Sequence, residues 1–123
     1  MPETEVVFYC EEDGSAPLIE WFDGLPKKAI AKCRVKIDRL HELGHELKRP
    51  DADYLKEDIY ELRTRLGSVN YRILYFFHGK KAVVLSHGFT KQQAKVPARE
   101  IKLAVQRKKA FKAKPQAHTY EAE

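Results

Sequence analysis

The segment from Ile59 to Lys91 constrains the fold most, because its apolar and polar residues alternate and two glycine turns interrupt it. Alternation with a period of two is typical of β-strands that have one covered face. The turn sequences LGSV and HGKK each place glycine first in a two-residue turn. We therefore predict an antiparallel meander of three strands, over Ile59–Leu66, Val69–His78 and Ala82–Lys91.

One strand and two helices are predicted ahead of the meander. The run EVVFYC, residues 5–10, has the β-branched and aromatic composition of a strand. A short amphipathic helix follows, with Ser15 as its N-cap and Pro17 near its first turn. From Lys27 the apolar residues recur every three or four positions, and Gly44 is placed to end this second, basic helix.

A final helix and a polar tail are predicted after the meander. Pro97 can occupy a helix start, and an apolar helical face continues from it to about Phe111. Residues 112–123 are polar and have no period, so we expect them to be an unordered tail. A chain of 123 residues can bury one core. The prediction is therefore a single small α+β domain over residues 1–111.

Counting back from the two turns predicts which polar residues lie side by side on the sheet. With two residues in each turn, Arg63 lies opposite Arg72, and Arg72 lies opposite His87. Residues two apart share a face of a sheet, so further residues join this row: Glu61, Arg65, Asn70, Leu74, Leu85, Phe89 and Lys91. The other face is mainly apolar and should pack on the two early helices; it carries Tyr60, Leu62, Leu66, Val69, Tyr71, Ile73, Tyr75, Phe77 and Val84.

Two arginines that face each other on neighbouring strands repel, which destabilises a sheet. One interpretation is a solvated ion-pair surface in which Glu61 neutralises Arg63. The other is a phosphate site, because two guanidinium groups can hold the non-bridging oxygens of a phosphate. In that site His87 would accept and donate protons near neutral pH, and Phe89 would offer a ring on which a base can stack.

The sequence HELGH, residues 41–45, offers a competing hypothesis, because it matches the H-E-x-x-H pattern of zinc metalloproteases. On a helix, two histidines four apart share one face and can bind one zinc ion, while the glutamate polarises the metal-bound water. A catalytic zinc also needs a third protein ligand, and the following ELKRPD does not continue a protease motif. Glu57 and Glu61 stay open as third ligands, although the strand pattern already uses Glu61.

Composition restricts the partners and the compartment. The chain has 23 Lys and Arg against 18 Asp and Glu, a net charge of +5, which suits a polyanionic partner but also serves solubility. Cys10 and Cys33 form no C-x-x-C pair and are interpreted as reduced thiols. The N-terminus lacks the pattern of a secretory leader, and no apolar run approaches membrane-spanning length. We expect a soluble cytoplasmic protein.

The segment IYELRTRLGSVNYRILYFFHGKKAVVLSHGFTKQQAKVPAREIKLA resembles the RelE/ParE toxin superfamily, in its phage-derived HigB-like branch. The preceding ELGHELKRPDADYLKEDIYELR also fits that branch, and the similarity extends over about residues 18–110. The motifs that carry it are Tyr60-Glu61-Leu62-Arg63, Tyr71-Arg72-Ile73-Leu74, His87-Gly88-Phe89 with Lys91, then Pro97, Glu100-Ile101 and Ala104.

The resemblance implies a RelE-like fold and an mRNA-cleaving toxin of a type II toxin–antitoxin pair, commonly acting on messages in the ribosomal A site. In such enzymes the ribose 2′-hydroxyl attacks the adjacent phosphate, without a metal ion or other cofactor. The partners implied are mRNA, the ribosome and a cognate antitoxin, a helix-turn-helix DNA-binding protein. The basic helix from Lys27 and the helix from Pro97 are the surfaces on which that antitoxin could dock.

The resemblance also implies roles for single residues. Arg63 and Arg72 would stabilise the charge on the attacked phosphate with help from Lys91, and His87 or Glu61 would transfer protons. RNA contacts are expected from Arg65, Asn70, Phe89 and Lys95. Some relatives have a catalytic tyrosine or acidic residue at the end of the last strand, where this chain has Thr90, Lys91 and Gln92, so the acid and base stay unassigned.

Two alternatives to the nuclease stay open within the same fold. Gyrase-poisoning relatives share the architecture without the RNA-cleaving residues, and the presence of Arg72 and His87 argues against that branch. A non-catalytic RNA-binding module would need the same basic face and stacking aromatic residue, but no proton transfer.

Overall fold

The computed structural model describes residues 3–92 and 95–121, which form a five-stranded sheet in the order β1-β5-β4-β3-β2. The strands are β1 (Glu5–Phe8), β2 (Ala52–Lys56), β3 (Ile59–Leu66), β4 (Val69–His78) and β5 (Ala82–Lys91). β1 runs parallel to β5, whereas the other neighbouring pairs are antiparallel. The three strands of the predicted meander begin and end at the predicted residues.

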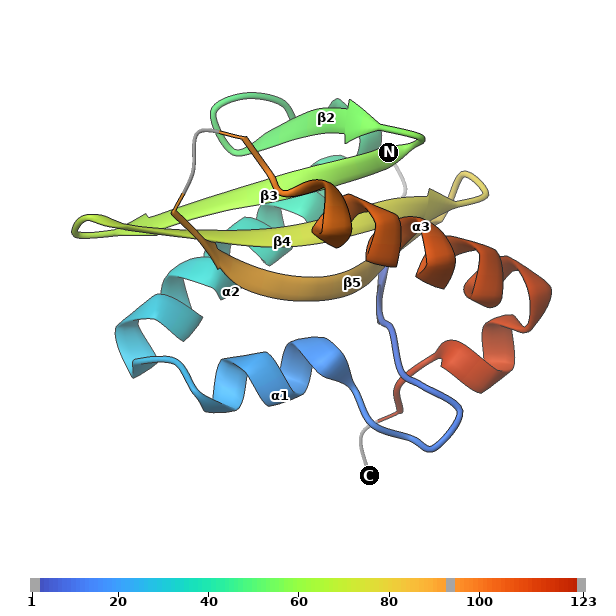
Figure 1. Cartoon of the computed structure of the whole chain (residues 1–123). Coiled ribbons are helices and arrows are strands. Elements are labelled where there is room, and N and C mark those ends of the chain that lie inside the picture. Colours follow the sequence, from blue (N-terminus) through green and yellow to red (C-terminus); the bar gives the residue numbers. More distant parts are fainter. Residues whose placement is uncertain (1–2, 93–94, 122–123) are drawn as a thin grey trace.

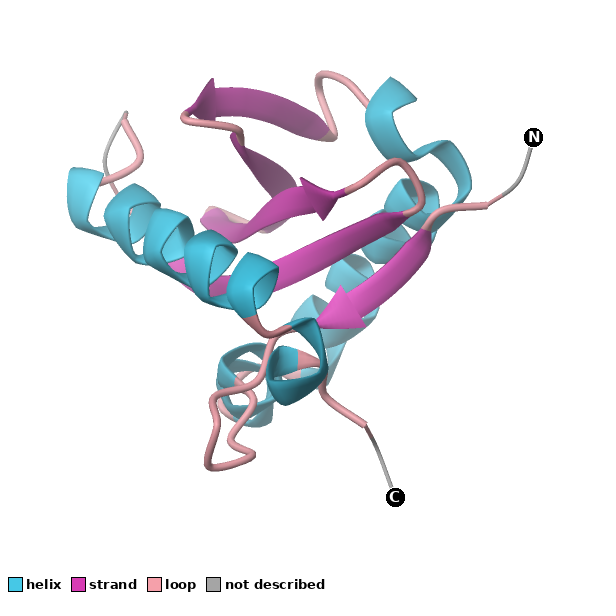
Figure 2. Ribbon diagram, turned by 90° about the vertical axis from the view of Figure 1, so that its right-hand side faces the viewer, coloured by secondary structure: helices cyan, strands magenta, loops and turns pink. Residues whose placement is uncertain are grey.

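Helices cover both faces of this sheet (Figures 1 and 2). They are α1 (Pro17–Asp23), α2 (Lys27–Leu43) and α3 (Ala98–Ala113), with short 3-10 helices η1 (Gly44–Glu46) and η2 (Pro115–His118). α1 and α2 pack on one face, and α3 crosses the other (Figure 1). The arrangement confirms the predicted single α+β domain with two early helices, a meander and a C-terminal helix.

The face that contacts α1 and α2 carries the larger core, as predicted from the alternating pattern. Leu62, Tyr71, Ile73 and Tyr75 of the sheet are buried there against Leu18, Phe22, Cys33, Ile37 and Leu40 of the two helices. Burial of this many apolar side chains is the main term that stabilises the domain. A second, smaller core lies under α3 and contains Ile59, Leu74, Phe76, Val84, Ile101, Ala104 and Phe111.

Strand β2 is absent from the sequence prediction. Residues 51–58, DADYLKED, are mostly polar and carry no clear alternation. The segment becomes a strand by pairing with β3, where Asp53 lies opposite Glu61, and it forms the edge of the sheet. Because pairing to an existing strand satisfies the backbone groups, such an edge strand needs little apolar pattern of its own.

The helix ends follow the prediction at α2 and differ from it at α1. Gly44 adopts a φ of 54° immediately after α2, and a side chain there would overlap the hydroxyl of Thr4. At α1 the N-cap is Ala16, which makes no side-chain cap, and the hydroxyl of Ser15 donates instead to Asp13. The sequence predicted Ser15 as the N-cap, and this prediction is wrong, because the hydroxyl of Ser15 is bound to the aspartate two residues earlier.

The second hairpin corrects one predicted pairing. His78 pairs with Ala82, so that turn has three residues rather than two, and Ser86 forms a β-bulge between the pairs Tyr75–Leu85 and Leu74–His87. Arg72 therefore lies opposite Phe89 rather than opposite His87. Because the two one-residue shifts add up to two, His87, Phe89 and Lys91 keep the predicted face.

Residues 82–85 of β5, between the three-residue turn and the bulge, are shifted by one residue relative to the predicted pairing. Each of their side chains therefore lies on the opposite face of the sheet from the one predicted. Leu85 is buried against α1 and α2, and Val84 is buried under α3. Both faces are the reverse of those predicted, because a register shift of one residue exchanges the two sides of a strand.

The C-terminal segment also differs from the predicted unordered tail. α3 continues to Ala113, and η2 then leads the chain back to β1, where Thr119 pairs with Tyr9. The buried ring of His118 stacks on Tyr9 with the ring centroids 5.0 Å apart. This packing orders a polar segment that has no period of its own; residues 122–123 lie outside the described part of the chain.

Candidate functional site

Three rows of residues cross β3, β4 and β5 on the sheet face that α3 partly covers. Directly paired residues on neighbouring strands share a face and lie side by side. The three rows are Glu61–Leu74–His87, Arg63–Arg72–Phe89 and Arg65–Asn70–Lys91. The sheet thus brings together eight of the nine residues that the sequence predicts for the site, and Lys95 follows β5 in a bend.

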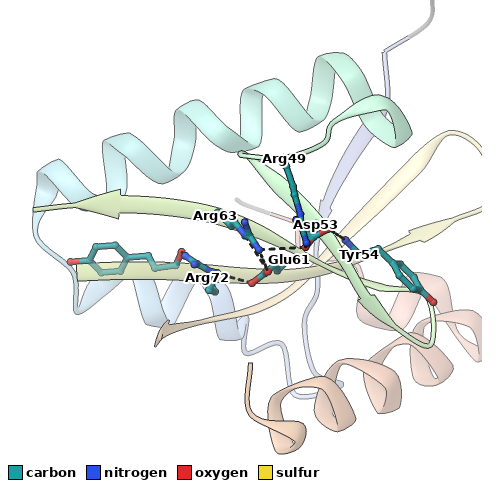
Figure 3. A network of polar contacts seen from close by, with 7 residues as sticks. Arg49, Asp53, Tyr54, Glu61, Arg63 and Arg72 are labelled. Atoms are coloured by element: carbon teal, nitrogen blue, oxygen red, sulfur yellow. Dashed lines mark hydrogen bonds and ion pairs between the residues drawn. The ribbon is translucent and has the colours of Figure 1, made fainter. Parts of the chain in front are cut away.

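Glu61 connects the two arginines that face each other (Figure 3). Its Oε2 accepts hydrogen bonds from Nε and Nη2 of Arg63, at 3.1 and 3.0 Å. Its Oε1 lies 3.0 Å from Nε of Arg72 in an ion pair. The carboxylate is 2% exposed; Arg63 hydrogen-bonds its Oε2, whereas Oε1 and Nε of Arg72 form an ion pair without a hydrogen bond.

Asp53 and Arg49 extend this network toward the edge of the sheet (Figure 3). Nη2 of Arg63 lies 3.4 Å from Oδ2 of Asp53, and Nη2 of Arg49 donates to the same oxygen at 2.8 Å. Sequence reasoning missed both residues because their positions depend on the unpredicted strand β2. The only sequence signal for them was the run of mostly polar residues that precedes the segment of alternating apolar and polar residues from Ile59.

The network explains how the sheet tolerates two facing arginines. One buried carboxylate lies between them, so the repulsion predicted from the pairing is offset by two ion pairs. Burial lowers the pKa of Arg72 from its ordinary value, while the nearby Glu61 acts in the opposite direction. Arg63 remains 29% exposed in its side chain, against 10% for Arg72, so Arg63 is the more accessible of the pair.

Lys91 lies in the next row and is half-buried. Burial lowers the pKa of its ammonium group below the ordinary value, and the neighbouring charges of Arg72 and Arg63 add to that effect against the opposing Glu61. A lysine with a lowered pKa is neutral more often near physiological pH, so it can accept a proton as well as donate one.

His87 is buried beneath the first turns of α3. Its Nδ1 lies 2.8 Å from the hydroxyl of Ser86, and its Nε2 lies 3.1 Å from Oε1 of Glu100. The residue is 6% exposed, and burial is the main cause that lowers the pKa of its imidazole, with Arg107 adding to it and Glu100 opposing it. The geometry holds His87 in place but leaves it little access to a bound molecule.

The remaining predicted contacts lie around this centre. Arg65 is exposed and donates from Nε to the carbonyl of Gly67, Asn70 is half-buried, and Lys95 is exposed. Phe89 is half-buried against the core under α3, with its ring centroid 6.1 Å from that of His87. These side chains surround the arginine pair with cationic, amide and aromatic groups.

The histidines of HELGH do not form the site that a zinc protease requires. α2 ends at Leu43, so His45 lies in η1 and no longer shares a helical face with His41. Nδ1 of His41 contacts the carbonyl of Thr4, whereas His45 stacks on Phe77 with the ring centroids 3.6 Å apart. Residues 3–92 and 95–121 hold no group of three His, Cys, Asp or Glu side chains placed for a metal ion.

Residues 20–109 match the model of the phage-derived Gp49-like proteins. The chain belongs to this Gp49-like family. It is also 32% identical over 105 residues to the probable endoribonuclease HigB1 of Mycobacterium tuberculosis strains CDC 1551 and H37Rv, covering 85% of this chain and 82% of the relative. These matches confirm the predicted phage-derived, HigB-like branch.

The part that matches the Gp49-like family contains the whole candidate site. It begins in α1 and ends in α3, so it includes the three rows, the Glu61 network and Glu100. Sequence reasoning did not give Glu100 a role, although the resemblance motif Glu100-Ile101 pointed to it. No helix in the described part of this Gp49-like protein is long and apolar enough to span a bilayer.

Proposed function

We propose that this Gp49-like protein is the toxin of a type II toxin–antitoxin pair and acts as an endoribonuclease on mRNA. The observation that carries the proposal is the direct pairing of Arg63 with Arg72 on the sheet face that also presents Lys91 and Phe89. The similarity to a probable endoribonuclease over most of both chains supports the same activity.

Arg63, the more exposed of the pair, would bind the phosphate that is cleaved, and the buried Arg72 would add its positive charge from beneath. A guanidinium group presents several N–H donors, and Glu61 occupies only one side of Arg63, which stays partly exposed. In the reaction the ribose 2′-oxygen bonds to phosphorus while the bond to the 5′-oxygen breaks, leaving a cyclic phosphate and a 5′-hydroxyl end. Arginine donors that are already held by Glu61 would stabilise the extra negative charge on the phosphate without reorganising.

Lys91 is the group that we assign to proton transfer. Both residues that the sequence analysis considered first are occupied: Glu61 is buried between two arginines, and His87 is buried between Ser86 and Glu100. Lys91 lies one row from Arg72, and its pKa is lowered by burial and by that arginine. Its neutral amine would accept the proton of the 2′-hydroxyl, and the resulting ammonium would assist the leaving 5′-oxygen.

His87 and Glu100 would then act as positioning residues. Their contact joins β5 to the first turns of α3 and supports the strand that carries Phe89 and Lys91. Arg65, Asn70 and Lys95 would contact the RNA backbone beside the cleaved bond, and Phe89 would stack on a base. No step in this scheme uses a metal ion.

The partner we propose is an antitoxin that covers the basic face or keeps the protein away from its RNA. The ribosome is the second proposed partner, because the RelE-like resemblance implies cleavage of messages in the A site. The exposed basic residues of α2, among them Lys28, Lys32 and Arg39, and those of α3 are the surfaces that such partners would contact.

The decisive experiment follows the cleavage of an mRNA fragment by the purified chain, with and without ribosomes, in buffer containing EDTA. The proposal expects EDTA-resistant products that end in a 2′,3′-cyclic phosphate or its 3′-phosphate product, and no product at a position where the ribose is 2′-deoxy. Growth arrest on expression, combined with intact RNA under both conditions, would instead favour the gyrase-targeting alternative.

A further inference from the structure

A groove runs along the side of α3 that faces the turn between β2 and β3. It has a volume of about 460 Å³, and its basic lining comes from Lys56 in β2 and from Lys102 and Lys109 in α3. Ala98 in the first turn of α3 also lines it. The first turn of α3 also carries Glu100, which contacts His87 in the row next to Arg72, so this helix links the groove to the sheet face of the candidate site.

A pocket of about 410 Å³ follows this groove at the far end of α3. The turn between β2 and β3 contributes Glu57 to the groove and Asp58 to the pocket, and α3 contributes Lys109 to the groove and Lys108 to the pocket. Figure 1 shows α3 crossing the sheet toward the β4–β5 hairpin, where the pocket includes Gly79. Lys108 of α3 also contacts the turn between β2 and β3, since its Nζ donates to the carbonyl of Glu57.

The pocket is aromatic on its walls and cationic at its rim. Tyr60, Phe77 and His78 line it and are half-buried, and His45 stacks on Phe77 from the surface. Tyr60 packs edge-on against Phe77 with the ring centroids 5.3 Å apart. These rings therefore support one another and present a rigid surface on which a planar group can lie.

The charges around the pocket favour an anionic ligand. Lys108 and the exposed Lys112 extend over it from successive turns of α3. The acidic residue of the lining, Asp58, lies 3.5 Å from Nζ of Lys108, so these two charges offset each other and Lys112 supplies the net positive charge. A planar aromatic ligand with an attached negative charge satisfies both features, and a nucleotide is such a ligand.

We infer that the pocket is a second nucleotide subsite, which takes an unstacked base of the RNA and holds its phosphate beside Lys108 and Lys112. This inference rests on the proposed nuclease function. The groove would carry the strand from the arginine pair to the subsite. Phe76 and Phe77 follow Arg72 by four and five residues along β4, a path of roughly 13–17 Å that several linked nucleotides span.

The test measures the binding of 2′-O-methyl RNA of increasing length to the full chain, because these probes lack the attacking hydroxyl and cannot be cleaved. We expect affinity to rise with length until the strand reaches the pocket. Lys112→Ala and His45→Ala should each weaken the long probe about 5- to 10-fold and leave a short probe unaffected. Lys112→Ala should also reduce the slope of log affinity against log salt by about 0.7.

Lys114→Ala is the matched control, since this residue also lies at the C-terminal end of α3, is exposed and pairs with Glu12 outside the pocket. It should bind both probes as the unmodified chain does. Adenosine and uridine 5′-monophosphate should shift the backbone amide resonances of residues 77–79, which an NMR titration measures.

Two results would overturn the subsite. In the first, the Lys112, His45 and Lys114 variants bind the long probe with equal affinity, and all of them still cleave RNA. The proposed nuclease would then stand without the subsite. The other is a glutamate-rich peptide that shifts the amides of residues 77–79 more than either nucleotide does, which would make the pocket a protein-docking site. Length-dependent binding by a chain that cleaves nothing would support the subsite and remove the proposed reaction.

Discussion

Arg63 of β3 and Arg72 of β4 are direct cross-strand partners, and both guanidinium groups contact the same carboxylate of Glu61. The ion pairs of the first interpretation are present, but around a buried rather than a solvated carboxylate, and the phosphate site stays a proposal that the same oriented donors support. Glu61 holds the guanidinium groups in place, and the exposed part of Arg63 remains available to an anion.

Replacing Arg63 by lysine should reduce the rate of RNA cleavage by about 100-fold or more. An ammonium group keeps the positive charge but lacks the planar set of donors that can contact Glu61 and a phosphate together. The measurement is the single-turnover rate on an mRNA fragment. Arg34→Lys is the control and should leave the rate unchanged, because Arg34 is exposed on α2, which packs on the other face of the sheet. Equal rates for the Arg63 variant and the unmodified chain would exclude Arg63 from phosphate binding.

Glu61→Gln should lower the free energy of unfolding by about 3–5 kcal/mol, because it removes the charge that two guanidinium groups share at a buried position. Sulfate should restore more stability to this variant than to the unmodified chain, since an anion can take the place of the lost carboxylate. Urea unfolding with and without sulfate measures both effects. Glu57→Gln, an exposed change in the β2–β3 turn, is expected to unfold as the unmodified chain does. Equal sulfate effects in both chains would argue that anions do not reach the arginine pair.

The pH dependence of cleavage distinguishes Lys91 from His87 as the proton-transfer group. Burial and Arg72 lower the pKa of Lys91 from its ordinary value of 10.5. The neutral amine forms as pH rises through that lowered pKa, so the rate should increase with pH and become constant above that pKa, which lies below 10.5. Lys91→Arg should lose this increase and slow cleavage by about 100- to 10,000-fold, because arginine stays charged. A rate that is already constant above about pH 6.5 would instead indicate a histidine.

Gly88→Ala should destabilise the fold by about 1–3 kcal/mol, because a methyl group on Gly88 would overlap the ring of Trp21 from α1. Urea unfolding followed by the fluorescence of this single tryptophan measures the change. Gly24→Ala is the control: its added carbon would lie 3.7 Å from the carbonyl oxygen of Trp21, an ordinary contact. Equal unfolding midpoints for the two variants would show that α1 can move away from β5 at little cost.

Local sequence features determined the strands and one half of the site. Alternation set the bounds of β3, β4 and β5, and the glycine turn at Gly67, with a φ of 61°, set the pairing of Arg63 with Arg72. These features are local because a tight turn specifies the register of the two strands that it joins. The family resemblance could therefore be stated from the residues alone and was confirmed by comparison.

The tertiary structure decided where the site residues of β5 lie and which of them are accessible. The bulge at Ser86 and the three-residue turn place Phe89 beside Arg72, and α3 covers His87 through Glu100. Nothing within β5 encodes this, because the bulge positions Leu85 under α1 and α2, which lie far away in the sequence, and Val84 under α3, which follows β5. The accessibility of a titratable side chain depends on which distant segments pack over it, so only the folded chain distinguishes Lys91 from His87.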